Sequence, residues 1–124
     1  MELTGVMIGS ENAAGLVAYY TDLFGEPGFR DDSFAGWQFG KGWVVVGAHD
    51  QVAGKSAHPG RVLWNLETAD VEGDFARLRD RGAIVVQEPY TPGGGSSDDG
   101  PQMRIATLAD PDDNYFQLMS PMGP

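Results

Sequence analysis

The sequence predicts an α+β fold of two tandem βαβββ modules, whose curved mixed sheets enclose a shared cleft. The order strand, helix, strand, strand, strand occurs twice in the 124 residues, offset by roughly 57 positions, as in an internal repeat. Each unit covers one sheet face with its helix, so two units can place their other faces across a common cleft. The modules are expected at about residues 1–50 and 61–124, with residues 51–60 as the connector.

The first module is predicted to begin with a strand over residues 3–9. Ser10 or Asn12 can then cap a helix, whose apolar positions recur at helical spacing as far as Gly25. Two strands follow at residues 33–40 and 42–49, joined by a tight turn around Lys41. The remaining strand has to lie in residues 27–32, "PGFRDD", which have little β character.

The second module is predicted to repeat this order. A strand over residues 61–68 leads to Asp70, a plausible helix cap, and to an apolar stripe formed by Val71, Phe75 and Leu78. A strand at residues 83–90 and a long loop at 91–101, either a lid or a plain surface loop, come next. Residues 103–109 and 114–119 form the closing hairpin.

Three aspartates and an asparagine occupy the turn of that hairpin, in "ADPDDNYFQL". A calcium loop would need glycine at its sixth position and glutamate at its twelfth, where Tyr115 and Pro121 stand. The segment instead predicts a tight turn, capped by the Asp110 side chain and containing residues that tolerate positive φ. In the strand after it, Gln117 shares one face with two larger side chains.

Composition excludes several functional classes. The net charge of −10, from 18 acidic and 8 basic residues without a basic cluster, argues against nucleic-acid binding. The absence of cysteine excludes disulfides, thiolate zinc sites and a cysteine nucleophile. We find neither a secretory signal nor an apolar run of membrane-spanning length, so a cytoplasmic protein with no membrane partner is expected.

Three features resemble the vicinal oxygen chelate superfamily, which groups glyoxalases, bleomycin resistance proteins and extradiol dioxygenases. They are the two similar halves of the chain, the helix end "YY…LFG" and the closing segment "DPDDNYFQL". The resemblance covers nearly the whole chain. The family ends in Asp-Pro-Asp-Gly-Asn, two residues and Glu-Leu, whereas this chain has Asp113 for the glycine and Gln117 for the glutamate. The resemblance implies the fold and a homodimer, but little about activity, because the superfamily houses enzymes and non-catalytic drug binders.

The resemblance also implies four inward-facing positions for metal ligands. They fall on Gly5, on one of Val45, Val46 and Gly47, on Leu63 or a neighbour, and on Gln117. Glycine and aliphatic side chains cannot coordinate a divalent ion, and a single glutamine is a weak donor. We therefore predict no metal cofactor at this site.

The favoured hypothesis is a metal-independent protein that holds a hydrophobic or aromatic small molecule. Aromatic walls with a few amides suit such ligands. Asn65 can either bind the ligand or pair with Gln117, and the sequence does not choose between the two. The predicted ligand-binding residues are Met7, Trp37, Phe39, Leu63, Asn65, Glu67, Met103, Tyr115 and Gln117.

The alternative hypothesis is an enzyme, either a glyoxalase-type lyase or isomerase or a dioxygenase-like protein. It requires a shifted metal site that uses His49, Glu67 and Gln117, or metal-free acid–base chemistry by Glu67. A third hypothesis is a protein whose cleft is filled by its own side chains.

Overall fold

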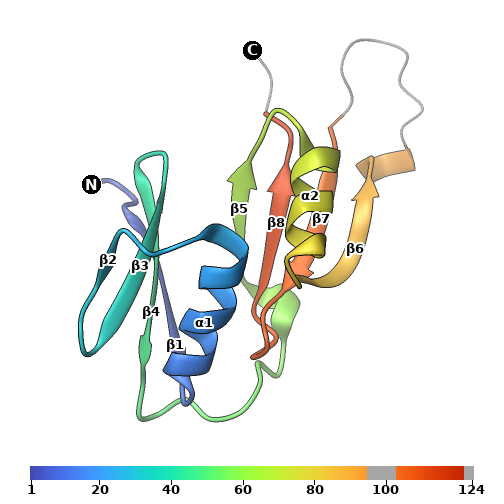
Figure 1. Cartoon of the computed structure of the whole chain (residues 1–124). Helices are drawn as coiled ribbons and strands as arrows, with labels where there is room; N and C mark the ends of the chain where they lie inside the picture. Colours follow the sequence, from blue (N-terminus) through green and yellow to red (C-terminus); the bar gives the residue numbers. More distant parts are fainter. Residues whose placement is uncertain (95–102, 122–124) are drawn as a thin grey trace. The chain divides into compact units, whose positions relative to one another are not determined.

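The computed structural model describes residues 1–94 and 103–121, and the chain forms two compact units (Figure 1). Unit 1 comprises Met1–Ala57 together with Asp110–Asp113, and unit 2 comprises the other described residues. Each unit holds one four-stranded mixed sheet and one helix, which confirms the predicted α+β class and the repeated βαβββ order.

The sheet of unit 1, called the first sheet below, has the strand order β1-β4-β3-β2. Strand β1 runs parallel to β4, and the other two pairs are antiparallel. The second strand does fall within "PGFRDD", but it is only two residues long. The elements are β1 (Gly5–Ser10), α1 (Ala13–Phe24), β2 (Phe29–Arg30), β3 (Phe34–Phe39) and β4 (Gly42–Ala48).

Helix α1 begins after Asn12, whose side-chain oxygen accepts a hydrogen bond from the Gly15 N–H at 3.1 Å. Of the two predicted caps, Asn12 is therefore the one that caps the helix. The Ser10 hydroxyl instead accepts from the Asn12 N–H at 3.0 Å and donates to Asp112 Oδ2 at 2.6 Å. The buried side of α1 consists of Leu16, Val17, Tyr20 and Leu23.

Helix α1 covers one face of the first sheet. The face that the helix of a sheet leaves uncovered is called its open face below. Helix α1 lies against β1 and β4 (Figure 1). The fully buried Val46 is paired with Ile8 and Ala35, so these residues define the covered face. Successive strand residues alternate between faces, and the neighbours of Val46 on β4, Val45 and Gly47, therefore lie on the open face.

The sheet of unit 2, called the second sheet, has the equivalent strand order β5-β8-β7-β6, with β5 parallel to β8. Strand β6 is an edge strand and contains register shifts on either side of Gln87. Short 3₁₀ turns occur at Pro59–Arg61 and Pro92–Gly94. The main elements are β5 (Leu63–Glu67), α2 (Val71–Asp80), β6 (Ile84–Tyr90), β7 (Ile105–Ala109) and β8 (Tyr115–Met119).

Helix α2 begins as the sequence predicts. The Asp70 side chain accepts from the Gly73 N–H at 3.0 Å, and the Val71, Phe75 and Leu78 stripe is buried. Neither helix in the described part of the chain has the length and apolar character needed to cross a bilayer. The predicted lid or surface loop falls mostly on residues 95–102, which lie outside the described residues.

Candidate functional site

The turn at residues 110–113 is structural, as the sequence predicts. Asp112 N–H donates to Asp110 Oδ1 at 2.9 Å, and Asp113 has a φ of 60°. Asp110 is fully buried, and its Oδ2 accepts a 2.6 Å hydrogen bond from the Tyr20 hydroxyl. Burial, together with the neighbouring Asp110 carboxylate, raises the pKa of Tyr20 far above its usual value. Asp110 therefore holds the turn and anchors helix α1.

The open face of the first sheet is apolar and partly aromatic. Met7 and Val45 are paired, and Gly36 is the next partner across the sheet. Phe29 packs over Gly36 and Phe34 packs over Gly47, so closely that a Cβ on either glycine would overlap the ring. Met7, Phe29 and Phe34 remain 63%, 40% and 36% exposed, which is a large exposure for side chains of this kind.

Two aromatic side chains predicted for the ligand wall lie on the covered face instead. Trp37 is 4% exposed, and its Nε1–H donates to the Gly25 carbonyl at 2.8 Å. The Phe39 ring lies 5.0 Å from Phe24 of α1, in an edge-to-face arrangement. The assignment of Trp37 and Phe39 to an open wall is therefore corrected: both pack beneath the helix.

The aromatic side chains of the open face are Phe29, Phe34 and Trp43, with the Phe29 and Trp43 rings 5.4 Å apart. Sequence reasoning missed Phe29 because its segment lacks β character. It missed Phe34 because alternation along β3 separates two sets of residues without showing which set the helix covers. The glycines at positions 36 and 47, opposite these rings, were the available signal.

The second sheet brings together most of the residues predicted for the site. Trp64 and Phe116 stack on each other at 4.6 Å between ring centroids, on the face opposite to the predicted residues. The open face therefore carries Leu63, Asn65 and Glu67 from β5 and Tyr115, Gln117 and Met119 from β8. Met103 precedes β7 and is partly buried outside the paired strands.

Gln117 lies in the middle of this face, and a neighbour holds its amide group. Its Nε2 donates to the Thr107 hydroxyl at 3.2 Å. Asn65 is its backbone partner on β5, and Thr107 is its partner on β7. Within the described residues, Gln117 makes its side-chain hydrogen bond with Thr107, and none joins the side chains of Asn65 and Gln117.

The residues at the implied metal positions do not fit a metal ion. A side chain cannot be placed at Gly5, where a Cβ would overlap the Trp43 carbonyl oxygen. Val45 and Gly47 face the open side, Leu63 is aliphatic, and Gln117 offers one amide. Divalent transition metals require several imidazole, thiolate or carboxylate ligands. Within residues 1–94 and 103–121, no three His, Cys, Asp or Glu side chains form a group that could hold a metal ion.

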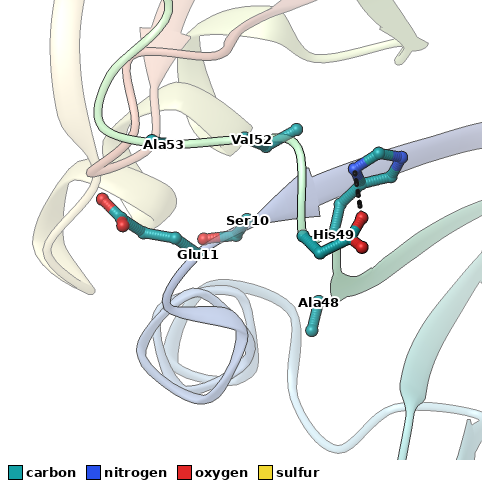
Figure 2. Close-up of a pocket in the computed structure, with 7 residues that line it drawn as sticks. Ser10, Glu11, Ala48, His49, Val52 and Ala53 are labelled. Atoms are coloured by element: carbon teal, nitrogen blue, oxygen red, sulfur yellow. Dashed lines mark ion pairs between the residues drawn. The ribbon is translucent and has the colours of Figure 1, made fainter.

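A separate surface depression of about 590 Å³ lies beside the start of α1 (Figure 2). Glu11 and His49 extend away from each other on either side of Ser10. Glu11 accepts from the Gly54 N–H at 2.7 Å, and His49 Nδ1 accepts from the Gln51 N–H at 3.1 Å. Both side chains thus hold the connecting segment in place. The depression, which the sequence did not predict, is lined by Ser10, Glu11, Ala48, His49, Asp50, Val52 and Ala53.

Comparisons with known proteins agree with the fold. A family model described as a glyoxalase-like domain matches residues 5–119. A structure described as a glyoxalase/bleomycin resistance protein/dioxygenase family enzyme from Burkholderia phytofirmans PsJN is 20% identical, with a TM-score of 0.71 over 98% of this chain and 100% of that one. A glyoxalase/bleomycin resistance protein from Catenulispora acidiphila DSM 44928 is 19% identical, with a TM-score of 0.72 over the same shares.

A structure described as a glyoxalase/bleomycin resistance protein/dioxygenase from Alicyclobacillus acidocaldarius is 12% identical, with a TM-score of 0.71 over 98% of this chain and 92% of that one. No curated protein sequence matches the chain. At these identities the solved structures establish the fold alone. The family model spans nearly the whole sequence, and the chain belongs to the glyoxalase-like domain family of the vicinal oxygen chelate superfamily.

Proposed function

We propose that the protein is a metal-independent binding protein that holds a hydrophobic or aromatic small molecule against the open face of a sheet. One observation carries the proposal. Where metal-dependent members of the superfamily place their ligands, this chain has glycine, aliphatic side chains and one amide, and the open face of its first sheet exposes Met7, Phe29 and Phe34. On such a surface, the favourable free energy of ligand binding comes from buried apolar area and ring contacts rather than from metal coordination.

The expected affinity is modest. Burying about 300 Å² of apolar surface contributes roughly 7 kcal/mol, and ring contacts add about 1 kcal/mol each. Association entropy offsets part of this, so a dissociation constant on the order of 10 µM is expected.

The direct test is a titration with the uncharged fluorescent probe N-phenyl-1-naphthylamine. We expect saturable binding to the wild type and about fivefold weaker binding to Phe34→Ala, which removes one ring from the open face. Val62→Ala is the matched control, because Val62 is 72% exposed and lies outside the strands. Absence of saturable binding, or equal weakening by both substitutions, would contradict the proposal.

Metal independence is tested separately by thermal unfolding of protein purified without a metal-affinity tag. Addition of nickel, zinc or manganese is expected to raise Tm by less than about 2 °C, because a ligand stabilises the native state only if it binds there. EDTA should leave probe binding unchanged. A larger shift, or loss of probe binding in EDTA, would require a metal site.

Glu67 is central to the catalytic alternative. Its side chain is exposed at the end of β5, and its backbone partner is Met119. Among the described residues no hydrogen-bond partner orients the carboxylate, as a general acid or base would require. The arrangement thus favours binding over acid–base chemistry.

A further inference from the structure

A row of neutral polar side chains crosses the middle of the open face of the second sheet. Asn65 on β5 is paired with Gln117 on β8, and Gln117 is paired with Thr107 on β7. Gln87, on the edge strand, is the next partner. Neighbouring strands lie about 4.8 Å apart, so these groups form a closely spaced line of donors and acceptors.

Apolar side chains flank this row on both sides. One neighbouring row consists of Leu63, Tyr115 and Ala109, and the other contains Met119 and Ile105 next to Glu67. On β5, β8 and β7, all of whose residues are described, Glu67 is the only charged side chain. An anionic ligand would therefore meet no cation on these strands, in a chain whose net charge is −10.

The first sheet shows that the fold does not require these amides. Its strand order is the same, and the equivalent row consists of Met7, Val45 and Gly36. Asparagine is disfavoured in strands, and at the equivalent positions the first sheet has apolar residues instead. A row of amides in one module only therefore indicates recognition rather than a demand of the architecture.

The hydrogen bonding of Gln117 fixes what the row presents. One N–H of its amide is held by the hydroxyl of Thr107, a residue that is 7% exposed, so the amide cannot rotate freely. Among the described residues, nothing pairs with its carbonyl oxygen or its second N–H, and the exposed amide of Asn65 lies on the neighbouring strand. A carboxamide satisfies a partner that offers a donor and an acceptor side by side.

We propose that this row selects an uncharged planar ligand with an N–H donor adjacent to a C=O acceptor, such as a lactam, an imide or a heteroaromatic amide. The ligand ring would lie over the flanking apolar residues. This inference rests on the proposed binding function and adds the chemical class of its ligand.

The test compares three bicyclic probes by calorimetry. These are 2-quinolone, which carries the adjacent N–H and C=O, naphthalene, which lacks both, and the anion 2-naphthoate. We expect 2-quinolone to bind roughly tenfold more tightly than naphthalene, because unpaired amides disfavour a purely apolar ligand. Binding of 2-naphthoate should be the weakest. Equal affinity for 2-quinolone and naphthalene, or preference for the anion, would overturn the inference.

Substitutions locate the effect. Gln117→Leu and Asn65→Leu should each reduce the preference for 2-quinolone about fivefold while leaving naphthalene binding unchanged, and Gln51→Leu, in an exposed loop, should change neither. Asn65 is exposed, so its variant decides the matter if Gln117→Leu fails to fold. If both variants bind naphthalene and 2-quinolone with the same preference as the wild type, this inference is wrong, but the proposed binding function still stands. Failure of all three probes and of N-phenyl-1-naphthylamine defeats the proposed function itself.

Discussion

At the scale of single residues, the buried pair of Tyr20 and Asp110 explains the sequence of the closing turn. The carboxylate accepts from the tyrosine hydroxyl and from the Asp112 N–H. A buried carboxylate is tolerated only with such partners. The turn was predictable from Asp-Pro and its neighbours. The tyrosine, 90 positions away, was not, because a single sequence carries no signal for that contact.

We expect Tyr20→Phe to lower the free energy of unfolding by about 1–3 kcal/mol, because it removes one hydrogen bond from a buried carboxylate. Tyr90→Phe, at a tyrosine 42% exposed, should change stability by less than about 0.5 kcal/mol. Urea denaturation at pH 7 measures both. Equal stability of the two variants would show that the buried hydrogen bond contributes nothing.

The raised pKa of Tyr20 predicts that the stability of the fold depends on pH in the alkaline range. Above about pH 10 an unfolded tyrosine releases its proton, whereas native Tyr20 keeps it. The unfolded state then binds fewer protons, so stability falls as pH rises, by up to about 1.4 kcal/mol per pH unit. The stability gap between wild type and Tyr20→Phe should therefore narrow between pH 9 and pH 11.5, and a constant gap would contradict this account.

At the scale of elements, both helix starts follow from local chemistry. Asn12 and Asp70 each accept from the backbone N–H three residues later. In α2, acidic residues stand in the first turn and arginines in the last, which suits the helix dipole. Strand β2 is the opposite case. Pairing with β3 makes Phe29 and Arg30 a strand despite their weak propensity.

The two ends of α2 allow a matched comparison. Asp70→Ala should cost about 1 kcal/mol of stability, because it removes the side-chain cap of Gly73 N–H. The same substitution at exposed Asp80, in the last turn, should be neutral or slightly stabilising, since a negative charge there opposes the dipole. Thermal unfolding distinguishes them, and a larger loss for Asp80→Ala would refute the capping argument.

At the scale of the whole molecule, exposed apolar residues favour association between chains, and the net charge opposes it. Strand β6 is a sheet edge whose Ile84, Val85 and Val86 are about 40% exposed. A sheet edge with exposed apolar side chains favours association with another chain. The net charge of −10 opposes association through like-charge repulsion, which salt screens.

We therefore expect a homodimer, with a mass of twice 13.3 kDa, whose dissociation constant falls when the salt concentration rises from 50 to 500 mM. Light scattering during size-exclusion chromatography measures both properties. Val85→Lys, which places a charge on the edge strand, should shift the population towards monomer. A monomer of 13.3 kDa at both salt concentrations would rule the dimer out.

The sequence by itself determined the repeated βαβββ order, the Asp70 cap of α2 and the closing turn. Each of these depends on residue type and local spacing. Only the tertiary structure decided that Trp37 and Phe39 lie beneath α1 while Phe29 and Phe34 are exposed. Alternation along a strand defines two faces. When both faces carry apolar residues, the packing of the helix alone selects which one is covered.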